Sequence, residues 1–281
     1  MSDEYDLESG PDPATFAAAT PEPEIDDATD NPVYAVGVGP GNPEYLTPRG
    51  RRAISEADVV VGFTTVVEFV EEQTDADLLT CGYKDEAEAL EAFGERVADG
   101  ESGTAVAMGD PNHSGYQFVG KVQDAVERAS TSPDSQTRQD AAEREDPETP
   151  VRVIPGISSI QMAASRARTP MEDTEFVTLH KSGDLGDDMD RLAAAVTEDE
   201  RHLLVLPRPY DRMPGDLAQF LLEEGAEPDL EALVLEKLTH EDEQIHRFTL
   251  AELSEHAGGS GEADTPFSDL IVLAVRQPVS G

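Results

Sequence analysis

A short apolar run, Val33–Val38, leads directly into the glycine-rich sequence Gly37–Gly41, and a helix start follows at Thr47 and Pro48. Three glycines within these five residues remove side chains that would keep a ligand away, and they permit backbone angles that other residues avoid. Thr47 is a good N-cap and Pro48 suits the first position of a helix. The segment therefore predicts a buried strand, a tight turn of bare backbone and a helix.

The same alternation of apolar run and helical periodicity continues to about residue 169. The further predicted strands are Val59–Gly62, Thr104–Met108 and Val151–Ile154. The predicted helices are Pro48–Glu56, Asp85–Asp99, Tyr116–Arg128 and Ile160–Arg168. Alternating strands and helices favour a largely parallel sheet, so residues 31–169 are predicted to form an N-terminal α/β domain.

Beyond Thr169 the pattern changes, because the last three of the later strand candidates have few helices between them. These candidates are Phe176–His180, Leu203–Leu206, Leu230–Lys237, Gln244–Thr249 and Leu270–Arg276. Such an order predicts some antiparallel pairing. Residues 170–277 are therefore expected to form a second α/β domain with a mixed sheet.

Two segments have the composition of disordered chain. Residues 1–30 combine several prolines with ten carboxylates and contain no Lys or Arg. Residues 130–150, rich in Ser, Gln, Asp, Glu and Pro, lie between a predicted helix and the next strand. Neither segment can bury enough apolar surface to offset the entropy lost on ordering. We expect an acidic N-terminal tail and a surface insertion inside the first domain.

The charge of the chain is extreme, with 60 acidic residues against 20 basic ones and a formal net charge of -40. Molar salt shortens the Debye length to about 3 Å and suppresses the repulsion between such charges. The composition therefore indicates a halophilic protein in a cytoplasm rich in salt. Nucleic acid is disfavoured as a partner because no basic stripe with interleaved aromatic residues occurs.

The remaining composition also favours a cytoplasmic protein. Cys81 is the single cysteine, which excludes an intramolecular disulfide. No N-terminal signal peptide is recognisable, and no apolar run approaches the roughly 18 residues that a membrane span needs. We therefore expect a reducing compartment and no membrane partner.

Three loops that follow predicted strands, Gly37–Gly41, Gly109–Pro111 and Pro155–Ser159, are expected to meet at one edge of the sheet. The first loop does not match the dinucleotide fingerprint, since Asn42 stands where that pattern needs a third glycine and Pro40 lacks a backbone donor. The segment Gly115–Val122 resembles a phosphate-binding P-loop, but its last residue has no hydroxyl for magnesium and its periodicity is helical.

Several residues in or near these loops have both a structural and a functional interpretation. Asp110 is placed either to form a turn or to accept hydrogen bonds from ligand hydroxyl or amino groups. Ser158 and Ser159 can cap a helix or contact a ligand through the free N–H groups there. His180, at a predicted strand end, is either a hydrogen-bonded structural residue or a group that touches a ligand.

A basic cluster, Arg49, Arg51 and Arg52, follows the first loop directly in a chain that is otherwise acidic. The cluster either forms a solvated helix face or attracts a ligand that carries several carboxylates.

Other chemistries have little support. The six histidines, at positions 113, 180, 202, 240, 246 and 256, show no metal-ligand spacing. The Gly-x-Ser-x-Gly sequence of many hydrolases is absent, and Cys81 has no arranged partner. We predict neither a protein-bound metal nor covalent hydrolytic catalysis.

Taken together, the three loops resemble those of the tetrapyrrole (corrin/porphyrin) methylase family. In that family one strand ends in Gly-x-Gly-Pro-Gly-x-Pro-x-x-Leu-Thr, a later one in Gly-Asp-Pro, and a further one in Pro-Gly-x-(Ser/Thr)-Ser. The chain carries Gly37–Thr47, Gly109–Pro111 and Pro155–Ser159 in that order. The resemblance covers residues 33–277.

The resemblance implies a methyltransferase with S-adenosylmethionine in a cleft between two α/β domains, usually in a homodimer. The cofactor-binding residues that it implies are Met108, Gly109, Asp110, Pro111, Ser158, Ser159, Leu206 and Pro207. The residues that it places against the tetrapyrrole are Gly39, Pro40, Gly41, Tyr116 and His180. His180 and Asp110 are the candidates for moving a proton. Met108 and Lys181 depart from the family, which often has Ser and Gly at these positions.

The features that resemble one subfamily imply methylation at C5 of cobalt-precorrin-7, in cobalamin biosynthesis. These features are Val59–Gly62, Ile157–Gln161, Thr178–His180, Glu241–Ile245 and Phe267–Leu270. Two alternatives stay open at this point. One is a methylase of another precorrin position or of a modified histidine, as in diphthine synthase. The other is a non-catalytic regulator that binds a nucleoside.

Overall fold

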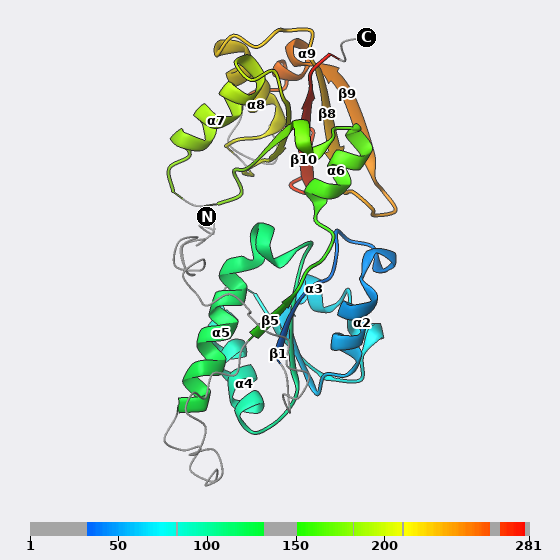
Figure 1. Ribbon diagram of the computed structural model, residues 1–281, viewed down its shortest axis with the longest axis vertical. Helices are drawn as coiled ribbons and strands as arrows, with labels where there is room; N and C mark the ends of the chain where they lie inside the picture. Colours follow the sequence, from blue (N-terminus) through cyan, green and yellow to red (C-terminus); the bar gives the residue numbers. More distant parts are fainter. Residues whose placement is uncertain are drawn as a thin grey trace. The chain divides into compact units, whose positions relative to one another are not determined.

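The computed structural model describes residues 33–82, 84–131, 151–181, 183–209, 211–258 and 265–278 (Figure 1). The chain divides between Ser158 and Ser159 into two compact units, each built on one five-stranded sheet. The expected acidic tail lies outside the described residues, as does the expected insertion from residue 132 onward. The composition predicts Ser130 and Thr131 as part of the insertion, but both residues continue a helix.

The sheet of the first unit is entirely parallel and has the strand order β3-β2-β4-β1-β5. Its strands are β1 (Val33–Gly37), β2 (Val59–Phe63), β3 (Asp77–Cys81), β4 (Gly103–Ala107) and β5 (Val151–Ile154). The prediction of a parallel N-terminal sheet is confirmed. The edge strand β3 was not predicted.

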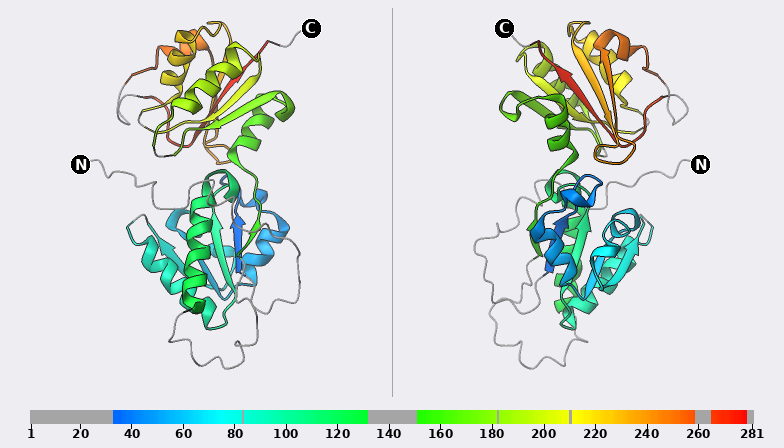
Figure 2. Two further views of the ribbon diagram at one scale, coloured as in Figure 1. Left: turned by 60° about the vertical axis from the view of Figure 1, so that its left-hand side comes forward. Right: turned by 90° about the vertical axis from the view of Figure 1, so that its right-hand side faces the viewer.

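Helices cover both faces of this sheet (Figures 1 and 2). They are α2 (Pro48–Ser55), α3 (Thr64–Val67), α4 (Glu86–Ala98) and α5 (Tyr116–Thr131), with short 3-10 turns at Pro43–Tyr45 and Glu71–Gln73. One buried cluster joins the sheet to α4 and α5 through side chains such as Phe93 and Val122. A second cluster joins it to α2 and α3 through side chains such as Ile54 and Val67. The result is a three-layer unit. The helices cover the faces of the sheet, and loops follow the carboxyl ends of its strands.

The sheet of the second unit is mixed, as predicted, with the strand order β6-β7-β10-β8-β9. Its strands are β6 (Thr174–Thr178), β7 (His202–Leu206), β8 (Glu231–Glu236), β9 (Gln244–Thr249) and β10 (Ile271–Arg276). Strands β6 and β7 are parallel, whereas β10 pairs antiparallel with β7 and β8, and β9 antiparallel with β8. The carboxyl ends of β6 and β7 therefore lie at the edge where β10 begins.

In the described part of the second unit, four α-helices pack on the sheet. They are α6 (Ser159–Ala167), α7 (Gly186–Thr197), α8 (Pro214–Glu223) and α9 (Leu250–Ser254). Side chains of α7, α8 and α9, such as Leu192, Leu217 and Leu253, join one buried cluster with the strands. Helix α6 contacts β7 and β10. These contacts place α6 in the second unit, although we had predicted a boundary at residues 169 and 170.

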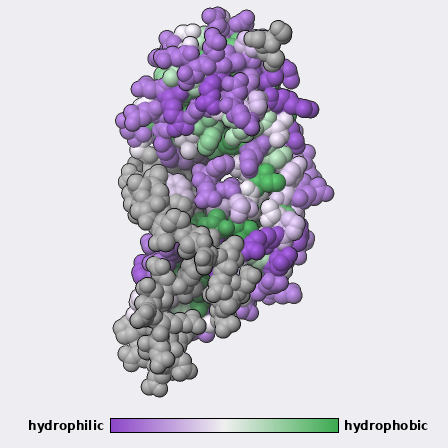
Figure 3. Space-filling model, viewed as in Figure 1, coloured by the Kyte–Doolittle hydropathy of each residue, from purple (hydrophilic) through white to green (hydrophobic). Residues whose placement is uncertain are grey.

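Most of the described surface drawn in Figure 3 is hydrophilic, with hydrophobic residues in small groups. Among the described residues, none of the helices combines the length and the apolar character needed to cross a membrane.

Cys81, at the end of β3, has a strongly protected thiol. The residue is 1% exposed, and its Sγ lies 3.5 Å from the Gly62 carbonyl oxygen. Burial, with smaller contributions from the carboxylates of Glu86 and Asp85, raises the pKa of the thiol to about 12. Because only the thiolate reacts with iodoacetamide, we expect the folded protein to resist alkylation at about pH 8. Mass spectrometry should show full modification only after unfolding, and rapid labelling of folded protein would contradict the buried position.

Candidate active site

The first two glycine loops are joined to each other by backbone hydrogen bonds at the carboxyl edge of the first sheet. The Val38 N–H donates to the Ala107 carbonyl at 2.9 Å. Gly39 and Gly109 then exchange two bonds, of 3.2 Å and 2.9 Å, as an isolated antiparallel bridge. Gly39 has a φ of 90° and Gly109 one of 65°, so glycine is needed at both positions. The loops Gly37–Gly41 and Gly109–Pro111 thus form one unit.

The third loop, which follows β5, approaches the other two so closely that side chains do not fit. A Cβ atom on Gly37 would lie 2.5 Å from the Gly109 carbonyl oxygen and 2.6 Å from the Gly156 nitrogen. A Cβ atom on Gly156 would lie only 2.1 Å from the same oxygen. The predicted convergence of the three loops is therefore observed.

Asp110 ties the second loop to the third. Its Oδ1 accepts a hydrogen bond of 2.8 Å from the Asn112 N–H, and its Oδ2 accepts one of 3.2 Å from the Gly156 N–H. The residue is half-buried. Each carboxylate oxygen has a further lone pair, so Asp110 can hold the loops and still accept a bond from a ligand. This arrangement favours a positioning role over the proton transfer that the sequence also suggested for it.

The chain continues from Asp110 into a π-helical turn, Pro111–Gly115, before α5 begins at Tyr116. Such turns are rare and recur at functional sites. Met108, directly after β4, is 39% exposed, and Tyr116 is half-buried. The segment that resembled a P-loop is helical from Tyr116 onward, as its periodicity predicted.

In the second unit, His180 lies in the loop after β6, two residues beyond the end of the strand. The Leu179 N–H donates to the Leu206 carbonyl at 2.8 Å, which holds this loop against the end of β7. The imidazole hydrogen-bonds the backbone of Pro207, and since proline has no N–H, the ring is the donor. One ring nitrogen then carries the proton, and the other is an acceptor in the neutral form.

Burial lowers the pKa of His180 below its ordinary value, although the bond to Pro207 and the charge of Asp269 act in the opposite direction. The imidazole is therefore neutral at neutral pH and can accept a proton. Leu206 is half-buried and Pro207 buried beside it.

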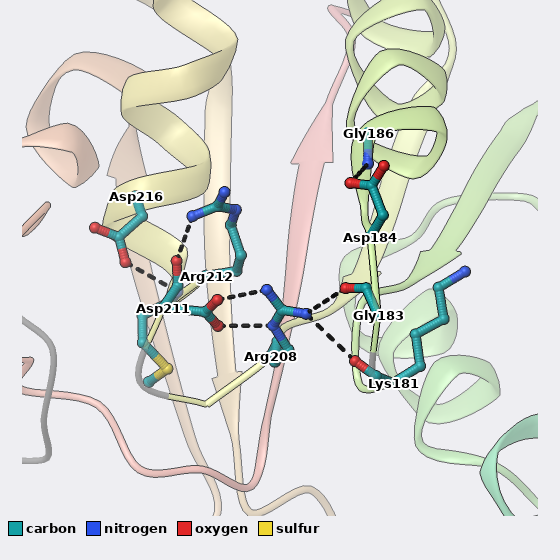
Figure 4. A network of polar contacts seen from close by, with 9 residues as sticks. Lys181, Gly183, Asp184, Gly186, Arg208, Asp211, Arg212 and Asp216 are labelled. Atoms are coloured by element: carbon teal, nitrogen blue, oxygen red, sulfur yellow. Dashed lines mark hydrogen bonds and ion pairs between the residues drawn. The ribbon is translucent and has the colours of Figure 1, made fainter. Parts of the chain in front are cut away.

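Arg208 connects the loops that follow β6 and β7 (Figure 4). Its Nη1 donates to the carbonyls of Lys181, at 3.5 Å, and Gly183, at 3.2 Å. Its Nε and Nη2 bind the two carboxylate oxygens of Asp211. The planar guanidinium can make this set of bonds because its donors are fixed in a fork. Arg208 therefore holds the main chain that directly follows His180.

We expect Arg208→Gln to cost about 1 kcal/mol of stability, because the two carbonyl bonds and the Asp211 pair are lost. The measurement is urea unfolding at fixed salt, together with the NMR signal of the His180 ring. That signal should change, since the loop beside it loosens.

Arg191→Gln is the matched control, because Arg191 also bridges a carboxylate and a carbonyl, those of Glu175 and Phe176. It should cost a similar amount of stability and leave the His180 signal in place. An equal change of that signal in both variants would contradict a local role for Arg208.

The predicted site residues thus form two groups, each within one unit. Gly39, Pro40, Gly41, Met108, Gly109, Asp110, Pro111, Tyr116 and Ser158 gather at the edge of the first sheet. His180, Leu206 and Pro207 gather at the edge of the second, and Ser159 starts α6. Their roles stay predictions. Sequence reasoning missed Arg208, although its position just after a strand end, between two prolines, was a usable signal.

Among the residues that the structure describes, no group of three or more His, Cys, Asp or Glu side chains is placed to hold a metal ion.

The sequence model of the Tetrapyrrole (Corrin/Porphyrin) Methylases matches residues 32–132 and 134–254. The chain belongs to this family of methylases.

Individual relatives agree with this assignment. The chain is 28% identical over 229 residues to a "Probable cobalt-precorrin-7 C(5)-methyltransferase" of Methanocaldococcus jannaschii, which covers 79% of this chain and 91% of the relative. The solved methyltransferase CobJ has a TM-score of 0.64 at 21% identity, covering 89% of this chain and 97% of that one. A Thermus thermophilus uroporphyrin-III C-methyltransferase, complexed with S-adenosyl homocysteine, has a TM-score of 0.57 at 22% identity and covers 88% and 92%. The two solved structures support the fold.

The edge of the first sheet fits a nucleoside cofactor in its chemistry. A Cβ atom on Gly109 would meet, among the described atoms, only the Cα of Ser158 within 4 Å, at 3.7 Å. Asp110 has acceptor capacity for hydroxyl or amino groups, and the exposed Met108 side chain offers apolar surface. These residues are the candidates for holding S-adenosylmethionine.

Proposed function

We propose that the chain methylates a corrin-pathway tetrapyrrole, cobalt-precorrin-7, at C5. The observation that carries this proposal is the match to the Methanocaldococcus jannaschii relative over 91% of that protein's length. The motifs Thr178–His180 and Phe267–Leu270, which resemble the same subfamily, support it. A cytoplasmic location and a homodimer remain predictions from the composition and the family resemblance.

When bound, S-adenosylmethionine supplies a methyl group on a sulfonium, and the thioether leaves uncharged, so no covalent nucleophile is needed from the protein. The main task of the chain is to align the two reactants. The glycine loops do this through rigid backbone, and Asp110 fixes the second loop against the third.

His180 is the candidate for accepting a proton from the methylated ring. Its ring N–H bonds the backbone of Pro207, and the second nitrogen of a neutral imidazole has a lone pair that can take a proton. Burial lowers the pKa of the imidazole, so the ring is neutral at neutral pH and can accept a proton. Arg208 keeps the following main chain in place.

The test combines calorimetry with mass spectrometry. Titration of the protein with S-adenosylmethionine and S-adenosylhomocysteine should show binding of both. Incubation of the protein with S-adenosylmethionine and cobalt-precorrin-7 should then raise the mass of the tetrapyrrole by one CH2 unit, since a methyl group is gained and a proton lost. NMR of the product should place the methyl group at C5. Binding of both nucleosides without methylation of any tetrapyrrole would favour a regulator instead.

A methyl group at another ring position would favour the second candidate, another methylase of the pathway. The fold likeness to a uroporphyrin-III C-methyltransferase supports this alternative, because one architecture accommodates several ring positions. The product NMR separates the two candidates directly.

A further inference from the structure

The segment that precedes β10, Phe267–Leu270, is anchored by an aromatic cluster at its first residue. The Phe267 side chain is 8% exposed. Its ring centroid lies 5.7 Å from that of His246, 6.1 Å from that of Phe248 and 5.7 Å from that of His256. These aromatic contacts hold the main chain just before Asp269 in place.

The two residues that flank Asp269 are held by consecutive residues at the end of β8. The Ser268 N–H donates to Glu236 Oε1 at 2.7 Å, and the Lys237 N–H donates to the Leu270 carbonyl at 2.8 Å. The other carboxylate oxygen of Glu236 lies 2.6 Å from His246 Nε2. The main chain at the exposed Asp269 is therefore fixed from both sides.

Glu236 keeps its charge in this arrangement. Burial alone would raise the pKa of its carboxyl, but the bonds from the Ser268 backbone and from His246 bring that pKa below its ordinary value. An ionised acceptor makes a stronger bond to the Ser268 N–H than a neutral one would.

Strand pairing brings this anchored segment to the same edge of the sheet as His180. Strand β10 runs antiparallel to β7, with Leu273 opposite Val205, so the residues before β10 lie beside the carboxyl end of β7. Strand β6 runs parallel to β7, with Thr178 opposite Leu206, and the loop with His180 leaves from that end. Asp269 and His180 thus flank the end of β7 from its two sides.

The charged groups around this edge are largely paired with one another. Lys181 pairs with Asp188, Arg208 with Asp211 and Lys237 with Asp242. Burial lowers the pKa of His180, and the charge of Asp269 acts against that shift. The pKa of Lys237 is raised mainly by its bond to Asp242, with a smaller contribution from Asp269.

We propose that Asp269 is a positioning residue for His180, compensating the positive charge that the imidazole acquires when it accepts one proton from the methylated tetrapyrrole. Glu236 and Lys237 hold the main chain that presents the carboxylate. The inference rests on the proposed function of His180 as the proton acceptor. The carboxylate takes no part in methyl transfer.

The test compares Asp269→Asn with a matched control, Asp173→Asn. The control removes a carboxylate that acts in the same way on a second histidine, the buried His202. NMR titration of the full chain with isotope-labelled histidine reports each ring, and His180→Gln assigns the His180 signal. In Asp269→Asn the pKa of His180 should move down and that of His202 should stay. In Asp173→Asn the reverse is expected.

The rate should follow the titration. A base loses activity as the pH falls through its pKa, so a lower pKa in Asp269→Asn moves the acid limb of the rate profile to lower pH. The plateau rate should fall by at most about fivefold, the value of one partly exposed charge pair. Asp269→Glu retains the charge and should restore both the limb and the rate, which separates this role from a loss of folding.

An unchanged His180 titration in Asp269→Asn would overturn the proposal. The proposal would also be overturned if the titration of His180 changed but the acid limb of the rate profile stayed at its original pH. Asp269 would then not act on the reaction through His180. The NMR measurement needs no substrate, so it reports on the pair even if another tetrapyrrole is methylated. Full activity of His180→Gln on cobalt-precorrin-7 would instead show that the methylation assignment is right and the proton acceptor wrong.

Discussion

Gly156→Ala is expected to destabilise the first unit by about 3 kcal/mol or more, near the upper end for a single substitution. The added Cβ would lie 2.1 Å from the Gly109 carbonyl oxygen and 2.7 Å from the Gly37 carbonyl carbon. These are backbone atoms of β1 and of the loop after β4, so neither can move aside without parting two strands. Urea unfolding at fixed salt concentration measures the loss.

The matched control is Gly186→Ala at the start of α7. A Cβ atom there would come no closer than 3.6 Å to the Asp184 side chain, an ordinary contact with a flexible group. Replacing glycine by alanine in a helix should leave stability unchanged or raise it slightly. If both substitutions cost the same, the close approach of the three loops would be wrong.

The glycine loops could be predicted because their sequence reflects a purely local requirement. Gly37, Gly39 and Gly109 occupy positions where a side chain would clash or the backbone angle is positive, and only glycine meets that need cheaply. Four consecutive buried strand residues such as Val59–Gly62 likewise show a central strand directly. The parallel first sheet and the mixed second sheet followed from these local signals.

Elements whose signal is weak were missed. Strand β3 has only one buried residue, Cys81, because it lies at the sheet edge, and Asp77–Cys81 therefore lacks an apolar run. Ser130 and Thr131 were assigned to the insertion on composition, yet their hydroxyls bond carbonyls one turn back and they continue α5. Composition does not distinguish a polar helix end from a loop.

The group of site residues at the edge of the second sheet depends on contacts between distant parts of the chain. His180 could be singled out from its place near a strand end, but Asp269 lies about ninety residues later and reaches the same edge only through the pairing of β10 with β7. Strand order in a mixed sheet is set by packing of the whole unit, which one sequence does not reveal. The bonds of Arg208 to Lys181 and Gly183 arise in the same way.

Salt is expected to raise the efficiency with the tetrapyrrole by about tenfold or more between about 0.1 M and 2 M KCl, through screening. The chain has a formal net charge of -40, and the proposed substrate carries several carboxylates, so the two repel each other at long range in dilute buffer. Molar salt shortens the range of this repulsion to about 3 Å, which leaves only the contacts within the site. The measurement is kcat/KM for cobalt-precorrin-7 across this range, with circular dichroism to verify that the chain stays folded.

The cofactor provides an internal control, because its charge has the opposite sign. S-adenosylmethionine has a sulfonium and an ammonium group against one carboxylate, so it is a cation that the acidic protein attracts. Its KM should stay level or rise with salt, while that of the tetrapyrrole falls. A salt effect that acted only by stabilising the fold would change both in the same direction. A kcat/KM for the tetrapyrrole that falls steadily with salt in folded protein would show that long-range repulsion does not limit its capture.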